Sequence, residues 1–301
     1  PNTGDIYLAG YTDSANFPTT TTALQTASGG GIDSFLARVS QDFSPSTFSR
    51  VVTRLGGAGN DYAYALLIHP QSGDVYIGGT TSSNNLPGIN SGSAQGIKAA
   101  TFAGFVSRIN RDLTGGLMST YLTGGADDTV YALAFDRASG TIIAAGESFK
   151  AAGAQTLPGT AGTAQPAHAG AVDAFITRLS PTLTSIPQST YLGGTSNETA
   201  YAVAVHPVSG EIFLAGATSS TAFTTPVDAG AIQASQAGSD DMFVARFSAD
   251  LTVRAQATYL GTSSLEQARA IAFNAAGTEV LLAGLALGAG FPGTATGAPT
   301  V

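Results

Sequence analysis

The residues best suited to chemistry are acids and arginines that recur at fixed places along the chain. One acid follows a Leu-x-Gly or closely related corner in each of four segments, and one arginine ends an apolar run in each. The acids are Asp61, Asp128, Glu198 and Glu266, and the arginines are Arg38, Arg108, Arg178 and Arg246. Carboxylate pairs are the groups that glycosidases use, and a ring of both charges would suit a ligand channel. An active site needs its constellation once, however, so the recurrence favours structural ion pairs or turn caps.

The three histidines are poorly placed for catalysis. His69 and His206 stand at one repeat position, where the other segments have Asp136 and Asn274, so we interpret them as polar turn residues. His168 lies in the loop AQPAHAGAVD without an evident partner, and a lone histidine of this kind is more often exposed. No Gly-x-Ser-x-Gly elbow is present, although a Ser/His/Asp arrangement stays open because serine is abundant.

A second set of acids raises the question of calcium. Asp33, Asp173 and Asp241 each stand two residues before a phenylalanine, and GND, ADD and SDD occur in loops. Calcium takes six to eight oxygen ligands, and no run here has the spacing of an EF-hand. We therefore favour turn-forming aspartates and predict no cofactor, with calcium as the weaker alternative.

Composition excludes several classes of protein. The 301 residues are 43% hydrophobic and 11% charged, which suffices for a core, and 38 glycines indicate many turns. A net charge of −8 argues against binding to nucleic acid or anionic membranes. The absence of cysteine excludes disulfides and thiolate metal sites. No apolar run is long enough to span a bilayer, and an opening without Met favours a mature or trimmed start.

The elements that position these residues repeat about every 68 residues. The corners begin at Leu55, Leu122, Leu192 and Leu260, which are 67, 70 and 68 residues apart. Each unit holds four short apolar runs, such as YALAF, TIIAAG, DAFITRL and PQSTYL, and none has a helical period. The first run alternates large and small residues, as in Tyr201, Ala202 and Val203, which suits strands of sheets stacked face to face.

Long loops follow the second run of each unit. Four apolar residues stand in them and form the candidate ligand-loop set: Phe17, Leu86, Leu157 and Phe223. Most of these residues precede a proline, and we expect the apolar side chain to plug the end of a sheet. Loops longer than an ordinary connection are also the first place to look for a ligand.

Four-stranded antiparallel units of this kind are typical of β-propeller blades. The string YLGG…AYAVAVHPVSGEIFLAGATSS…DMFVARFS resembles the SBBP family of bacterial β-propeller repeats over the whole chain. It departs from the family pattern at GESFKAAGAQTLPG and at LALGAG. The expected fold is an all-β propeller forming one domain over 1–301, with about four and a half blades and about 17 strands. We interpret it as a segment of a longer propeller. A weaker alternative is that the spare strand pairs with a neighbouring molecule.

The expected function is non-enzymatic. The resemblance implies a secreted or cell-surface bacterial module, and the acidic surface with spare strand edges favours protein partners or self-association over nucleic acid or membrane insertion. A carbohydrate- or ligand-binding propeller is the first alternative, in which tyrosines replace the absent tryptophan. A propeller hydrolase is the second, and it would need a non-repeated acid cluster or partners for His168.

Overall fold

The computed structural model describes residues 4–41, 50–124, 127–150, 156–221 and 230–292. These residues form seventeen strands and no helix, and the strands make five antiparallel sheets. The all-β class and the four-stranded antiparallel unit are thereby confirmed. No helix of the length and apolarity needed to cross a bilayer occurs among the described residues.

Three sheets have four strands, and a shorter sheet lies at each end of the series. The first sheet holds β1 (Ile6–Thr12), β2 (Asp33–Val39) and β3 (Arg50–Leu55). The second holds β4 (Asp61–Ile68), β5 (Val75–Thr81), β6 (Ala103–Ile109) and β7 (Met118–Leu122). The third holds β8 (Asp128–Phe135), β9 (Ile142–Phe149), β10 (Val172–Leu179) and β11 (Gln188–Leu192). The fourth holds β12 (Glu198–Val205), β13 (Ile212–Thr218), β14 (Asp241–Phe247) and β15 (Arg254–Leu260), and the last holds β16 (Glu266–Phe273) and β17 (Val280–Ala286).

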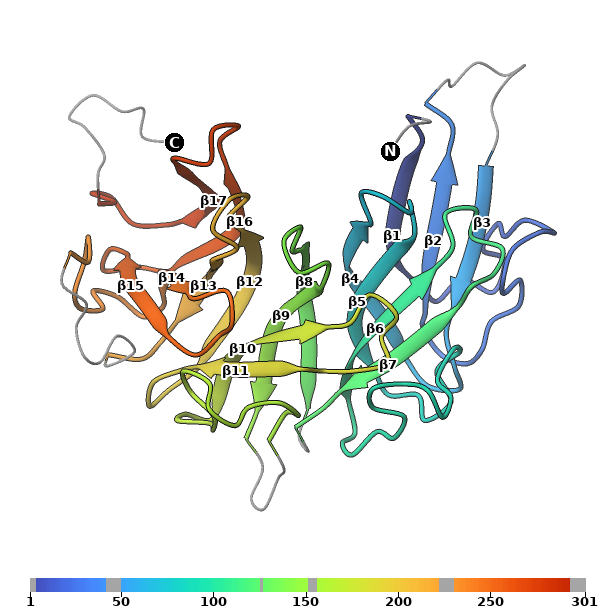
Figure 1. Cartoon of the computed structure of the whole chain (residues 1–301), viewed down its shortest axis with the longest axis horizontal. Coiled ribbons are helices and arrows are strands. Elements are labelled where there is room, and N and C mark those ends of the chain that lie inside the picture. The colour runs from blue at the N-terminus through green and yellow to red at the C-terminus, as the bar shows by residue number, and fades with distance from the viewer. Residues whose placement is uncertain (1–3, 42–49, 125–126, 151–155, 222–229, 293–301) are drawn as a thin grey trace.

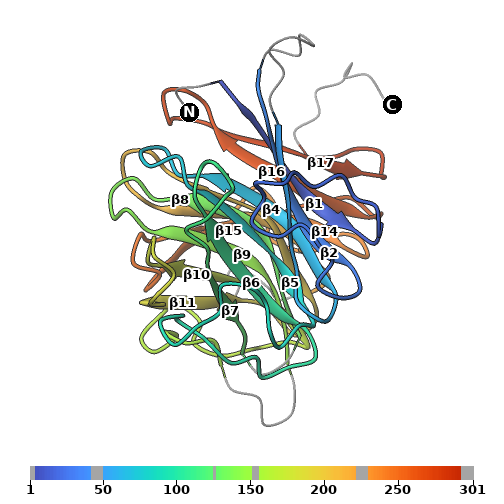
Figure 2. The same cartoon turned by 90° about the vertical axis from the view of Figure 1, so that its right-hand side faces the viewer.

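Strands keep the same order in every sheet, so we number them by their place in the repeat. The first strands are β4, β8, β12 and β16, the second strands are β1, β5, β9, β13 and β17, and the third strands are β2, β6, β10 and β14. The sheets follow one another along an open arc, with the first strands on its inner side and with the sheets of β1 and β17 at its two ends (Figure 1). Seen from the side, the sheets lie one behind another (Figure 2).

Every first strand carries a β-bulge that the sequence pattern did not reveal. In β4 the pairing with β5 passes from Ala63 directly to Ala65, so Tyr64 is the extra residue. The bulge brings the first-strand backbone so close to the second strand that a Cβ on Gly79 would collide with the carbonyl oxygen of Tyr62. The expected large/small alternation is interrupted there, and Tyr64 stays 45% exposed while Ala63 is buried.

The core lies between successive sheets. Between the third and fourth sheets, Ile143 and Ile176 of one pack with Leu214 and Phe247 of the other. The turn after the third strand adds a buried leucine to this packing. These leucines are Leu113, Leu183 and Leu251, all fully buried and all in the left-handed region with φ of 58–59°. A leucine rarely adopts this conformation, so burial of its side chain offsets the backbone cost.

Candidate functional site

The recurring acids cap the corners that precede them. Glu198 is fully buried, accepts the N–H of Gly194 at 2.7 Å and accepts the hydroxyl of Thr218 at 2.6 Å. Asp61, Asp128 and Glu266 likewise accept the N–H four residues before them, from Gly57, Gly124 and Thr262. These contacts are those of caps, and within the described ranges no ion pair joins any of the four acids to an arginine.

The recurring arginines pair with a different set of acids, at the turn between first and second strands. The closest N–O distances are 2.6 Å for Arg38 to Asp5, 2.6 Å for Arg108 to Asp74, 2.6 Å for Arg178 to Asp136 and 3.7 Å for Arg246 to Glu211. Both charge sets are thus structural, but they do not meet. The expectation of ion pairs holds for the arginines, with partners that the repeat pattern did not identify.

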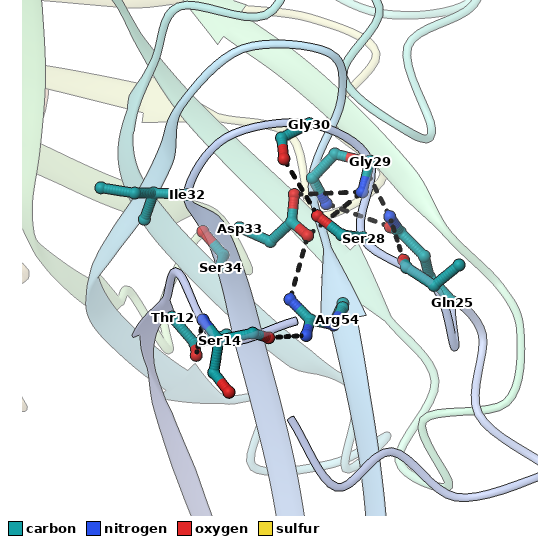
Figure 3. Close-up of polar contacts among 12 residues, drawn as sticks. Thr12, Ser14, Gln25, Ser28, Gly29, Gly30, Ile32, Asp33, Ser34 and Arg54 are labelled. Atoms are coloured by element: carbon teal, nitrogen blue, oxygen red, sulfur yellow. Dashed lines mark hydrogen bonds and ion pairs between the residues drawn. The ribbon is translucent and has the colours of Figure 1, made fainter. Parts of the chain in front are cut away.

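The aspartates considered for calcium hold the loop that enters the third strand. Asp173 accepts the N–H groups of Ala169 and Gly170 at 2.8 and 2.9 Å, together with the side-chain amide of Gln165. Asp33 accepts the N–H of Gly29 and also forms a buried ion pair with Arg54 at 3.2 Å (Figure 3). Over the described ranges, no group of three or more His, Cys, Asp or Glu side chains is arranged to hold a metal ion.

A glutamine that the sequence analysis did not single out lies in the long loop of each of four units. Its amide oxygen accepts the N–H of the residue after the corner leucine, which ties the long loop to the end of the fourth strand. The four glutamines are Gln25, Gln95, Gln165 and Gln233, bonded to Gly56, Thr123, Gly193 and Gly261. They are 70, 70 and 68 residues apart, close to the spacing of the repeat, so the periodicity itself could have identified them.

The loop residues proposed as ligand contacts are packed inside the molecule. Leu86 and Leu157 are 2% and 1% exposed and pack into the core. The backbone N–H of each donates to a tyrosine hydroxyl of its own sheet, from Leu86 to Tyr121 at 3.4 Å and from Leu157 to Tyr191 at 2.8 Å. Phe17 is half-buried, with its ring 4.8 Å from that of Phe35 and with Arg54 over its face. This packing fits their expected role as plugs, and it leaves the side chains of Leu86 and Leu157 little surface for a ligand. Phe223 lies outside the described residues.

His69 and His206 are turn residues, as the pattern predicted. Each ring accepts two backbone N–H groups of its own turn through Nδ1, at 3.0–3.3 Å. Asp136 and Asn274 accept turn N–H groups at the same repeat position.

His168 differs from the expectation, since its side chain is only 9% exposed. Nε2 lies 3.1 Å from Ser148 Oγ, Nδ1 lies 3.9 Å from Asp173 Oδ1, and the ring packs at 4.2 Å on Tyr191. The residue types are those of a Ser/His/Asp triad, but Ser148 is fully buried and the His–Asp distance exceeds a hydrogen bond. As arranged, Ser148 is not open to a substrate.

Three tyrosines and an arginine form a row of partly or fully exposed side chains along the first strands. The bulge residues of successive first strands meet: the rings of Tyr64 and Tyr131 are 5.4 Å apart, as are those of Tyr131 and Tyr201. Arg269 closes the row, 3.9 Å over the ring of Tyr201. Each of these residues is the extra residue of its bulge.

One acid lies among these rings. Glu147 accepts the hydroxyls of Tyr131 at 2.9 Å and Thr199 at 2.7 Å. Burial and the adjacent Glu147 raise the pKa of Tyr131. The phenol therefore stays protonated and acts as a hydrogen-bond donor, and the row offers aromatic faces with one cation and one acid. Such a surface suits binding more readily than a proton-transfer step.

Comparison with known proteins adds little at the level of sequence. No family model matches the chain, and no curated protein is similar to it. Among solved structures, a candidate 6-phosphogluconolactonase from Bacteroides uniformis has a TM-score of 0.39 and 14% identity, covering 92% of this chain and 61% of its own. Sqt1 from Chaetomium thermophilum has a TM-score of 0.35 and 10% identity, covering 87% and 65%. The chain spans less than two thirds of either protein's length, and likenesses this distant carry no argument about its activity.

Proposed function

We propose that the sheets are blades of a β-propeller of the SBBP type and that the chain is a non-enzymatic protein-interaction module, placed outside the cell or on its surface. One observation carries the interaction role: an apolar hollow of about 210 Å³ beside the last sheet. Its lining includes Phe213, Val244 and Leu260 of the fourth sheet and Val280 and Leu282 of β17.

Between the third and fourth sheets, the position equivalent to this hollow is filled by apolar side chains. Between the third and fourth sheets, Phe247 at the end of β14 and Leu251 in the following turn are fully buried against the neighbouring sheet. The last sheet has no described third strand, so no such residues cover the hollow. Apolar surface left open beside a well-packed stack favours a protein partner that brings its own apolar side chains.

Sedimentation equilibrium over a concentration series tests this role. We expect the 30.1 kDa chain to self-associate as its concentration rises, because each copy presents open apolar surface. Leu282→Asp places a charge in the hollow and should shift association to much higher concentration. Val208→Asp, at a turn residue that is 84% exposed, is the matched control and should behave as the unmodified chain. A chain that stays monomeric at every concentration contradicts the proposal.

The tyrosine row supports a second candidate, a carbohydrate- or small-ligand-binding propeller. Neighbouring aromatic rings beside a carboxylate are typical of surfaces that bind polar, flat-faced ligands. A glycan-array screen that stays blank for the unmodified chain contradicts this candidate, whereas binding lost on Tyr131→Ala supports it.

A further inference from the structure

We propose that the tyrosine row binds an arginine side chain of a partner protein, with the guanidinium placed on the ring of Tyr131 and paired with Glu147. The row consists of the bulge residues Tyr64, Tyr131, Tyr201 and Arg269. This inference rests on the proposed interaction role and names the chemistry of one partner group. The site itself is built from β8, β9 and β12, strands of two four-stranded sheets in the middle of the chain.

Glu147 is a charged residue at a repeat position that is uncharged in the other sheets. The equivalent residues, each directly after the second-strand glycine, are Tyr11, Thr80, Ala217 and Leu285. Thr80 reaches the next sheet with its hydroxyl, which donates to the carbonyl oxygen of Asp128 at 2.9 Å. Ala217 has no polar side chain at all, so the stacking of the sheets does not require a carboxylate here. A charge that the repeat does not need points to a ligand.

The half-buried carboxylate of Glu147 can accept two more hydrogen bonds. Its two oxygens accept one hydroxyl each, from Tyr131 at 2.9 Å and from Thr199 at 2.7 Å. Each oxygen keeps a second lone pair, and a guanidinium uses one acceptor site on each oxygen when it donates two parallel hydrogen bonds. None of the ion pairs within the described part of the chain includes Glu147, so its charge is available to a cation from a partner.

The row already holds one guanidinium of the chain itself. Arg269 lies 3.9 Å over the ring of Tyr201, within the distance of a cation–π contact. The next ring, Tyr131, has the rings of Tyr64 and Tyr201 at 5.4 Å, tilted by 42° and 53°, so neither of them stacks flat on it. A planar guanidinium can stack on a ring and bond both oxygens of a carboxylate, which an ammonium cannot do. The site therefore favours arginine over lysine.

The electrostatics of the chain also favour a cationic ligand. The net charge of −8 attracts a basic segment of a partner. Burial and the adjacent Glu147 raise the pKa of Tyr131, and burial raises the pKa of Tyr64, so both phenols stay neutral. The rings thus remain uncharged aromatic faces beside one carboxylate.

NMR titration of the chain, with its tyrosine rings labelled with carbon-13, tests the inference. The probe is the peptide Gly-Ser-Gly-Arg-Gly-Ser-Gly, and two matched peptides carry citrulline or lysine in place of arginine. Citrulline keeps the shape of the side chain and removes its charge. We expect the arginine peptide to shift the Tyr131 ring resonances saturably and to bind about tenfold or more tightly than the citrulline peptide. The lysine peptide should bind more weakly than the arginine peptide.

Variants of the protein test whether the carboxylate and the ring cause this preference. Glu147→Gln should remove most of the preference for arginine over citrulline, whereas Glu279→Gln, at an exposed acid just before β17, should keep it. Both variants lose one negative charge, so the control accounts for the change in net charge. Tyr131→Leu removes the ring and leaves the charge, and it should weaken binding of the arginine peptide by about threefold or more, read from the Tyr64 ring.

Absence of saturable shifts at about 10 mM peptide overturns the inference, and so does equal binding of the arginine peptide and either matched peptide. An equal effect of both glutamine variants also overturns it, because net charge would then be the cause. Methylguanidinium ion is the probe for a small ligand. It should bind about threefold or more weakly than the arginine peptide, because it lacks most of the aliphatic stem. Equal affinity overturns the assignment to a protein partner.

Sedimentation separates this inference from the proposed interaction role. If the chain self-associates while the arginine peptide does not bind, the inference fails and the interaction role stands. If the peptide binds while the chain stays monomeric, the inference stands and the role of the apolar hollow fails. Failure of both measurements removes the two together.

Discussion

Replacing Asp128 by asparagine should make the protein less sensitive to pH. Burial raises the pKa of Asp128 to about 7, and the hydrogen bonds from Ser148 and from the N–H of Gly124 offset only part of that effect. The folded state therefore binds this proton more tightly than the unfolded state, so the acid favours folding at pH 4 and loses that contribution as pH rises to 7. The rise from 3.8 to about 7 corresponds to about 4 kcal/mol at about 1.4 kcal/mol per pH unit.

Urea unfolding at several pH values between 4 and 8 measures the effect as a difference. Relative to the unmodified chain, Asp128→Asn should gain about 3 kcal/mol of unfolding free energy between pH 4 and pH 7, whatever its offset at pH 4, because this window leaves out both ends of the titration. Asp112→Asn, at an exposed surface ion pair, should change stability by less than about 1 kcal/mol. A difference between the chain and Asp128→Asn that does not vary with pH, or that varies in the opposite direction, refutes the reasoning.

Three further predictions test the packing by the same urea unfolding, two of them with a matched control variant. Gly79→Ala should destabilise by about 3 kcal/mol through collision with the bulge backbone, and Gly140→Ala, at a positive φ with open space, by about 1 kcal/mol; equal losses would contradict the bulge argument. Leu183→Ala should cost about 2–5 kcal/mol, and a loss below 1 kcal/mol would show that this leucine does not hold neighbouring sheets together. Arg178→Ala breaks a buried ion pair and should cost about 3–5 kcal/mol, against less than about 1 kcal/mol for the more exposed Arg246→Ala; the reverse order would be contradictory.

The strands and their order were predictable because they follow from periodic residues. Corners, hairpin glycines and apolar runs recur about every 68 residues, and they identify the four-stranded unit without reference to long-range contacts. The capping role of Glu198 was predictable for the same reason, since three other units carry an equivalent acid.

What the sequence did not reveal depends on contacts between units or on backbone geometry. The bulge that exposes Tyr64 is invisible in an alternating pattern, because alternation marks faces but not an inserted residue. The surroundings of His168 come from a loop folding back on Ser148 and Tyr191, which are 20 and 23 residues away in the chain. The acids that pair with the arginines were missed because they stand in turns and look like ordinary turn residues in the sequence. Asp74 and Glu211 are examples.

Hydrogen–deuterium exchange tests most directly the proposal that the apolar hollow beside the last sheet takes part in association. In a dilute monomer, amides of β1 and β17 should exchange much faster than those of β5 and β13, which lie between two hydrogen-bonded neighbours in complete sheets. Raising the concentration to the associated form should slow exchange in β17 and leave exchange in β5 and β13 unchanged. Equal and strong protection of all four strands in the dilute monomer would contradict the account.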